Sequence, residues 1–329
     1  MLIGIGYDLV FQCRERTAMV LALYTHPSHR RHLVGSDAVR SDPLLPIEEY
    51  VDGFGNRCGR LTAPPGRLHL WSHAMVAVSG LPDEVAPQAG QLPLDQLPAD
   101  TLVYLLASRY CESDRLMQTA WQLFGHTAPG WARVQAICNW VHQNVTFGYQ
   151  HARGDRTAVD VFNERRGVCR DFAHLSIAFC RAMNIPARYA SGYLGDIGVP
   201  ADPAPMDFSA WFEVYLGGRW YTFDARHNKP RIGRVLMVRG RDATDTAITT
   251  AFGSNSLVGF RVWTDELRAD RPLPDIFRAS TGGAEGSGLL TSRRHPVAAV
   301  PADPDWTPPP PVGASVRNAA ATLTMGGNN

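Results

Sequence analysis

The sequence predicts an α+β protein in which an antiparallel β-sandwich is followed by a core of helices packed on an antiparallel sheet. Two observations lead to this prediction. Residues 2–80 contain short apolar or alternating runs separated by Gly, Pro, Asn and Asp, as is typical of a sandwich. From residue 100 onward, helical periodicity comes first and strand patterns follow. Helices and strands are therefore segregated along the chain rather than alternating, which favours antiparallel sheets.

The N-terminal part is expected to form a β-sandwich domain over residues 1–80. Its strands are predicted at Leu2–Phe11, Thr17–Tyr24 and Arg67–Val78, and the last of these alternates over most of its length. Residues 81–99 are rich in Pro, Gln and Asp, so we predict a linker there.

The second part, residues 100–266, is predicted to be the core domain. The helices expected from apolar stripes and capping residues are Thr101–Glu112, Arg115–Phe124, Trp131–Val145, 157–165 and Gly167–Met183. The strands expected after them are Ala187–Leu194, Ala210–Leu216, Arg219–Asp224, Arg234–Val238 and Val258–Glu266. Residues 267–329 are rich in Gly and Pro and poor in apolar side chains, so they are predicted to be a mostly disordered tail.

The charge of the chain excludes some classes of partner. Its 329 residues carry 32 Lys and Arg against 31 Asp and Glu, a net charge of +1, which gives no basic field for nucleic acid. No run approaches the ~20 apolar residues of a membrane span. The N-terminus lacks the basic region of a signal peptide, so we expect a cytoplasmic protein.

The cysteine pattern gives no sign of a metal or of disulfides. The six cysteines are Cys13, Cys58, Cys111, Cys138, Cys169 and Cys180. They form no CxxC pair and no Cys/His set with zinc spacing, and in a cytoplasmic chain of this length disulfides are not expected. Nucleotide-binding loops and an HExxH motif are also absent from the sequence, so no cofactor is expected.

Cys169 differs from the other cysteines in its position. Gly167 permits a sharp turn, and the apolar pattern that follows places Cys169 in the first turn of a helix. Helix N-termini carry free N–H groups and the positive end of the dipole, so we expect a lowered thiol pKa and a ready site for an oxyanion. Cys180, on the apolar stripe of the same helix, is expected to be a core residue.

A hairpin over residues 208–224 is expected to present the partners of this thiol. Its turn is Gly217-Gly218, and pairing outward from it places residue 211 opposite 224 and residue 209 opposite 226. Residues 209 and Asp224 are then diagonal neighbours on one face, which suits a base at 209 oriented by a carboxylate at 224.

Four sequence blocks, at 167–173, 184–193, 210–214 and 220–224, resemble the bacterial transglutaminase-like superfamily in order and spacing. The resemblance covers about residues 130–250, and the β-rich front is similar to the N-terminal domain that often precedes this core. It implies a papain-like α+β core with a Cys-His-Asp triad, in which Cys169 is the nucleophile and Asp224 the orienting acid. The family's histidine immediately precedes the Ala-Trp pair, and here that residue is Ser209.

A serine cannot act as general base near pH 7, and losing that group typically costs ~10²–10⁴ in rate. Three histidines are candidates to replace the missing base. His227 could reach the site only if the strand ends at Asp224, whereas His174 is expected to point away along the helix. His151 lies in a loop and cannot be placed.

The roles of two charged residues near the hairpin remain open. Asp207 shares the face of Ser209 and could be a weak proton acceptor, and Arg226 could pair with Asp224 as a structural remnant of the triad.

Two functions follow from this pattern. The first is a cysteine peptidase or amidase, or an acyltransferase to an amine, that acts on a peptide or isopeptide amide bond through the Cys169 thiolate, with Ser209 in place of the expected histidine. The alternative is a catalytically impaired pseudoenzyme that binds a peptide or a partner protein in the same cleft. The expected partner is a peptide or protein, with neither nucleic acid nor membrane, and the oligomeric state stays open.

Overall fold

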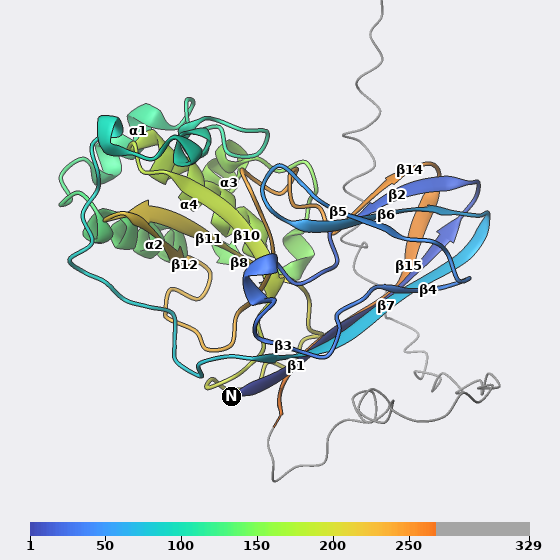
Figure 1. Cartoon of the computed structure of the whole chain (residues 1–329). Coiled ribbons are helices and arrows are strands. Elements are labelled where there is room, and N and C mark those ends of the chain that lie inside the picture. Colours follow the sequence, from blue (N-terminus) through green and yellow to red (C-terminus); the bar gives the residue numbers. More distant parts are fainter. Residues whose placement is uncertain (268–329) are drawn as a thin grey trace, which may run out of the picture.

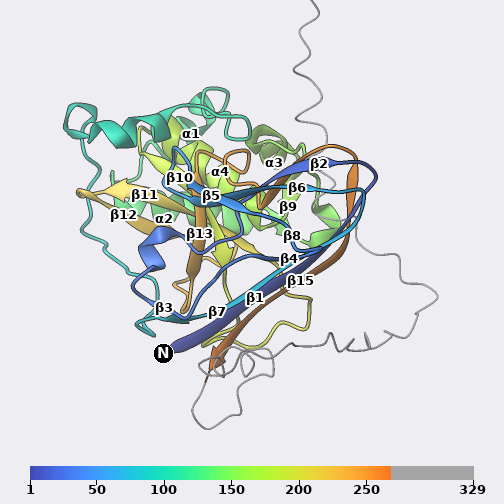
Figure 2. The same ribbon diagram turned by 45° about the vertical axis from the view of Figure 1, so that its right-hand side comes forward.

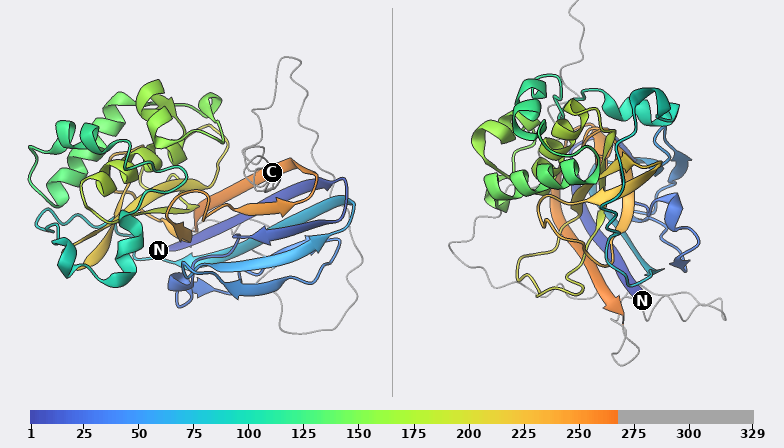
Figure 3. Two further views of the ribbon diagram at one scale, coloured as in Figure 1. Left: turned by 90° about the horizontal axis from the view of Figure 1, so that it is seen from above. Right: turned by 90° about the vertical axis from the view of Figure 1, so that its left-hand side faces the viewer.

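The computed structural model describes residues 1–267 and confirms the α+β class (Figure 1). The N-terminal part is β-rich, whereas the helices gather around a separate sheet on the other side of the molecule (Figure 3). Apart from Leu267 itself, the tail predicted over residues 267–329 lies outside the described residues.

The N-terminal part is a sandwich of two antiparallel sheets. One sheet has the order β15-β1-β7-β3, with β4 also pairing with β7, and the other has the order β14-β2-β6-β5. The strands are β1 (Leu2–Cys13), β2 (Thr17–Leu21), β3 (Leu33–Val34), β4 (Arg40–Asp42), β5 (Glu48–Val51), β6 (Arg57–Ala63), β7 (Gly66–Ala77), β14 (Thr249–Phe252) and β15 (Asn255–Leu267).

The sandwich includes strands from the far end of the described chain. Sequence reasoning grouped residues up to 266 with the core, but β15 pairs with β1 along its whole length, from Leu2 opposite Leu267 to Cys13 opposite Asn255 (Figure 2). Strand β14 likewise pairs with β2. A strand pattern predicts that a strand exists but not which strand it joins, because pairing is decided by tertiary packing.

The second part packs helices on one face of a four-stranded sheet with the order β12-β11-β10-β13. The helices are α1 (Met117–Phe124), α2 (Trp131–Asn144), α3 (Ala158–Glu164) and α4 (Cys169–Ala182). The sheet strands are β10 (Ala187–Tyr193), β11 (Ser209–Leu216), β12 (Arg219–Phe223) and β13 (Val235–Gly240), and a short parallel pair is formed by β8 (Thr146–Phe147) and β9 (Arg166–Gly167).

Helix α4 is the centre of this part. Every residue from Asp171 to Ala182 is buried, and its apolar side chains Phe172, Leu175 and Phe179 are at most 2% exposed. At ~25 cal/mol per Å² of apolar area, burial of these side chains is the main force that holds the helix on the sheet. The opposite face of this sheet packs on the sandwich. Its residues Tyr193 and Val235 lie in the same hydrophobic cluster as the sandwich core.

Residues 101–112, predicted as a helix, are helical only over the 3₁₀ turn Ala99–Leu105. The backbone beyond it is bound by tertiary partners instead. The buried guanidinium of Arg181 donates a hydrogen bond to the Leu106 carbonyl at 3.0 Å, and the Tyr110 N–H donates to Asp242 at 2.9 Å. These contacts replace the hydrogen bonds that a helix would have made.

The segment 81–99, predicted as a linker, lies against the core. Its Asp83 carboxylate accepts hydrogen bonds from the Arg231 N–H at 2.9 Å and the Arg234 guanidinium at 2.8 Å, while the Gln91 amide donates to the Met183 carbonyl.

Candidate active site

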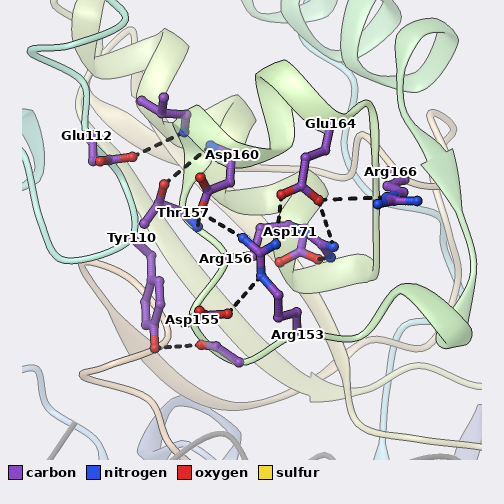
Figure 4. A network of polar contacts seen from close by, with 12 residues as sticks. Tyr110, Glu112, Arg153, Asp155, Arg156, Thr157, Asp160, Glu164, Arg166 and Asp171 are labelled. Carbon is purple, nitrogen blue, oxygen red and sulfur yellow. Dashed lines mark hydrogen bonds and ion pairs between the residues drawn. The ribbon is translucent and has the colours of Figure 1, made fainter. Parts of the chain in front are cut away.

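The first turn of α4 is fixed by polar contacts beneath Cys169. Val168, in an extended conformation, is the N-cap, and its N–H donates to the Asp171 carboxylate at 3.0 Å. Asp171 is fully buried and pairs with Arg156 at 3.1 Å (Figure 4). It also pairs with Arg170 at 3.1 Å. Gly167 has no room for a side chain, because a Cβ there would stand 2.6 Å from Asp171. The sequence signal Gly-x-Cys therefore reflects close packing at the helix start.

The Cys169 sulfur lies beside the start of β11. Its side chain is half-buried, and Sγ accepts a hydrogen bond from the backbone N–H of Ala210. That nitrogen is bonded to the carbonyl carbon of Ser209, so the backbone at Ser209 and Ala210 lies beside the Cys169 sulfur.

The lowered pKa expected for the thiol is wrong. Burial raises the pKa of Cys169 to about 11, although the Arg226 charge and the Ala210 N–H oppose this rise. The charges of Asp207 and Asp171 add to it. Loss of hydration therefore outweighs the Arg226 charge and the Ala210 N–H, and it disfavours the thiolate.

Ser209 occupies the position of the expected base. It is buried, and its carbonyl accepts a hydrogen bond from Ser191 Oγ at 3.1 Å. Its own Oγ finds no hydrogen-bond partner among residues 1–267. The hydroxyl thus neither orients nor deprotonates another described side chain.

Asp224 follows the end of β12, and it is held by two partners. Its Oδ2 accepts from His227 Nδ1 and from Arg234 Nη2, both at 2.8 Å. Although burial alone would raise the pKa of Asp224, the Arg234 guanidinium and the His227 ring hold it well below its usual range. Asp224 forms its ion pair with Arg234, so the predicted Asp224–Arg226 pair is wrong.

A turn explains where His227 and Arg226 go. The predicted register places Leu216 opposite Arg219, as observed, but the ladder stops at Phe212–Phe223 and does not extend to 209 and 226. The chain then turns back, with the Asn228 N–H donating to the Asp224 carbonyl at 2.7 Å. The turn brings the His227 ring to Asp224, which the sequence left open.

Of the other two candidate histidines, His174 has a structural role. His174 is buried, its Nε2 accepts the Ala243 N–H at 3.1 Å, and its ring stacks on Tyr110. Burial lowers the pKa of His174, so it is a neutral acceptor. His151 ends a 3₁₀ turn, Tyr149–His151, and its carbonyl accepts from Arg156.

The Cys169 thiol interacts electrostatically with Tyr149, Asp207 and Arg226. The Arg226 guanidinium lies 3.8 Å over the Phe147 ring and hydrogen-bonds to Tyr149. Its charge acts on Cys169 and on Asp207. Burial raises the pKa of Asp207 to about 6, against the Phe208 N–H and the Arg226 charge.

Sequence reasoning missed Tyr149 entirely. Tyr149 is placed near Cys169 by the short parallel pair of β8 with β9. A hydrogen bond of 3.1 Å from the Gly148 N–H to the Gly167 carbonyl continues this pair. This pairing carries the loop after β8 to the helix start, and two-residue strands of this kind have no recognisable sequence pattern.

Two further observations concern the described part of the chain. None of its helices combines the length and the apolar character that a membrane span requires. Within residues 1–267, no three or more His, Cys, Asp and Glu side chains come together as metal ligands would.

Comparison with known proteins defines the class. Residues 118–225 match the family model of the transglutaminase-like superfamily. The chain also superposes with a TM-score of 0.72 on a solved structure from Cytophaga hutchinsonii, described as a candidate cysteine protease. The two share 32% identity, and the match covers 83% of this chain and 92% of that one. The chain therefore belongs to the transglutaminase-like superfamily, as its sequence blocks indicate.

Its curated relatives are mycobacterial. An uncharacterised protein of Mycobacterium leprae is 25% identical over 252 residues, which are 74% of this chain and 88% of that protein. An uncharacterised protein of Mycobacterium tuberculosis is 36% identical over 95 residues, which are 26% of this chain and 30% of that protein.

Proposed function

We propose that this protein is a cysteine-dependent peptidase or amidase, a hydrolase that opens a peptide or isopeptide amide bond through Cys169. The observation that carries the proposal is the position of the sulfur. Cys169 is the first residue of α4, a position at which helices leave backbone N–H groups without intrahelical acceptors, and its sulfur lies against the Ala210 N–H. Donors of this kind stabilise the oxyanion that forms when sulfur attacks a carbonyl.

Asp224 is proposed to act as a positioning group rather than as a partner of residue 209. Its bonds to His227 and Arg234 hold the end of β12 and the following turn, which carries Arg226 towards the thiol. Turnover is expected to be slow, because a triad histidine is worth about 10²–10⁴ in rate and Ser209 does not supply it.

A second candidate is favoured by Ser209 itself. A buried hydroxyl with no partner in the described residues, next to a thiol with a pKa of about 11, is also what a member without catalysis would contain. Such a protein would bind a peptide or a partner protein beside α4 without cleaving it.

The test compares the full chain with two variants on fluorescein-labelled casein, with products identified by mass spectrometry. We expect slow cleavage by the wild type, none by Cys169→Ala, and a gain of about 10²-fold or more for Ser209→His. Cleavage that survives in Cys169→Ala would contradict a thiol mechanism. Casein bound but left intact by both wild type and Ser209→His would favour the binding protein. Addition of monodansylcadaverine shows whether an amine competes with water as acceptor.

A further inference from the structure

We propose that His26 and His29 form an acid-sensitive contact that ties the sandwich to the edge of the core sheet at Leu236, and that mild acid opens it. This histidine contact joins the two parts of the molecule, so it is separate from the chemistry proposed for Cys169.

The sandwich meets the core sheet at an edge strand. Within residues 1–267, β13 ends the order β12-β11-β10-β13 and pairs only with β10, so the backbone groups on its outer side need other partners. The His26 N–H donates to the Leu236 carbonyl at 2.9 Å, and the Leu236 N–H donates to His29 Nε2 at 3.0 Å. Both histidines belong to the short 3₁₀ turn Pro27–His29 and its N-cap, drawn in blue between the two parts (Figure 1).

A second contact holds β13 without a titratable group. Asn56 Oδ1 accepts the Arg239 N–H at 2.8 Å, and Asn56 Nδ2 donates to the Arg239 carbonyl at 2.7 Å. Asn56 is fully buried, and its Nδ2 also donates to the Asp52 carboxylate at 2.9 Å. An amide side chain does not ionise, so only the contact at Leu236 depends directly on a histidine proton.

Both rings make their hydrogen bonds in the neutral form. His29 Nε2 accepts the Leu236 N–H, and His26 Nδ1 accepts the Ser28 N–H at 3.1 Å. A ring nitrogen that gains a proton becomes a donor and can no longer accept these bonds. The His26 Nε2 atom is buried and has no hydrogen-bond partner in the described chain, so nothing there compensates the charge of an imidazolium. Protonation of His29 therefore breaks the bond to β13, and protonation of His26 disrupts the turn that positions it.

The charges around the rings also oppose protonation in the closed form. Glu213 pairs with Arg188 at 2.6 Å and with Arg239 at 3.0 Å, so these three groups already carry one net positive charge. Burial is the largest cause that lowers the pKa of both His26 and His29 to about 4. The charged and titratable groups that act on His26 are Arg239, Glu213, His29 and Arg188, of which only Glu213 opposes this fall, and those that act on His29 are His32 and Arg239.

The direction of the pH effect follows from these values. An exposed histidine has a pKa of about 6.5, so the open form binds more protons than the closed form between pH ~6.5 and ~4. The stabilisation from the two rings is fully present above pH ~6.5 and is lost as pH falls through ~4. At pH 5, protonation of each ring favours the open form by about 10–30-fold relative to pH 8. Arg234, two residues before Leu236, pairs with Asp224 at 2.8 Å, so the opening starts beside the contact that holds the turn after β12.

The experiment measures amide hydrogen exchange of the full chain, residue by residue by NMR, at pH 7.5 and pH 5, with correction for intrinsic exchange rates. We expect protection of the Leu236 amide to fall about 10-fold or more at pH 5, because its acceptor is protonated. The Arg239 amide should keep its protection, because Asn56 does not titrate. In His29→Gln the side-chain oxygen can accept the Leu236 N–H at either pH, so the fall at Leu236 should be at least about 3-fold smaller than in the wild type.

His126→Gln is the control, because His126 is exposed, and it should behave like the wild type. Unchanged protection of Leu236 in wild type at pH 5 would overturn the acid-sensitive contact, as would an equal fall at Leu236 and Arg239. A fall in His29→Gln as large as in the wild type would also overturn it. If His29→Gln does not fold or is already unprotected at Leu236 at pH 7.5, the comparison of Leu236 with Arg239 in the wild type decides.

Discussion

The two sides of the candidate active site differ in how completely their polar groups are paired. At the first turn of α4, Asp171 uses both carboxylate oxygens, one for Val168 and Arg156 and the other for Arg170. At the start of β11, the buried Ser209 hydroxyl has no partner within residues 1–267. The nucleophile is therefore held by a network that stabilises the fold, whereas the position of the expected base contributes little to it.

The largest expected effect breaks the paired side. Asp171→Ala removes the fully buried carboxylate that pairs with Arg156 and Arg170 and leaves Arg156 with Glu164, and removing one partner of a buried ion pair typically costs about 3–5 kcal/mol. We expect a loss of that order in the free energy of unfolding, measured by urea denaturation at pH 7. The control is Asp155→Ala, whose side chain is 75% exposed where it pairs with Arg153 and which should change the value by less than about 0.5 kcal/mol. Equal losses in both variants would contradict the difference between the buried network and its surface.

A smaller effect concerns the pH dependence of stability. The pKa of Asp207 is raised to about 6 in the folded protein, above its unfolded value of about 3.9, so the folded state binds more protons between these pH values. Stability from this group is present below pH ~3.9 and is lost as pH rises through ~6. Asp207→Asn should therefore stabilise the protein at pH 7, by about 1–2 kcal/mol after allowance for partial exposure, and by nothing near pH 3.5.

Urea denaturation of wild type and Asp207→Asn at pH 7.5, 5 and 3.5 measures this difference. A variant that is less stable than the wild type at pH 7.5 would show that the carboxylate stabilises the fold, which is the opposite sign. Asp224 is expected to show that opposite sign, because the pKa of Asp224 is lowered and its contribution is lost as pH falls.

The smallest effect is expected on the unpaired side. Ser209→Ala removes a buried hydroxyl that makes no hydrogen bond in the described structure, so the free energy of unfolding should stay the same or rise by less than about 1 kcal/mol. Ser191→Ala is the matched comparison, because that hydroxyl donates to the Ser209 carbonyl, and its loss should cost about 0.5–1.5 kcal/mol. A larger loss for Ser209→Ala than for Ser191→Ala would mean that the Ser209 hydroxyl has a partner after all.

Local signals in the sequence were enough to predict the helix that begins at Cys169 and the hairpin that turns at Gly217-Gly218. Both depend on residues close in the chain: a glycine that allows a sharp turn, an apolar stripe, and a two-residue loop. The neighbourhood of Cys169 and Ser209 followed from these two elements and from the family resemblance.

What could not be predicted depends on distant contacts. The rise of the Cys169 pKa comes from burial, which a helix position does not reveal. The roles of Tyr149 and Arg226 depend on the β8–β9 pair and on the turn after β12. The helix predicted over 106–112 does not form, because backbone groups there bond to distant residues. The Leu106 carbonyl, for example, accepts a hydrogen bond from Arg181, 75 residues further along the chain.

The pairing of β15 with β1 has a consequence for biosynthesis. The first sheet is incomplete until Asn255–Leu267 has emerged, long after its central strands β1 and β7 have left the ribosome. At translation rates of about 5–20 residues per second, the delay is on the order of 10–40 s. During that interval one edge of β1 presents unpaired backbone groups to the cell, which is where a nascent-chain chaperone would be needed.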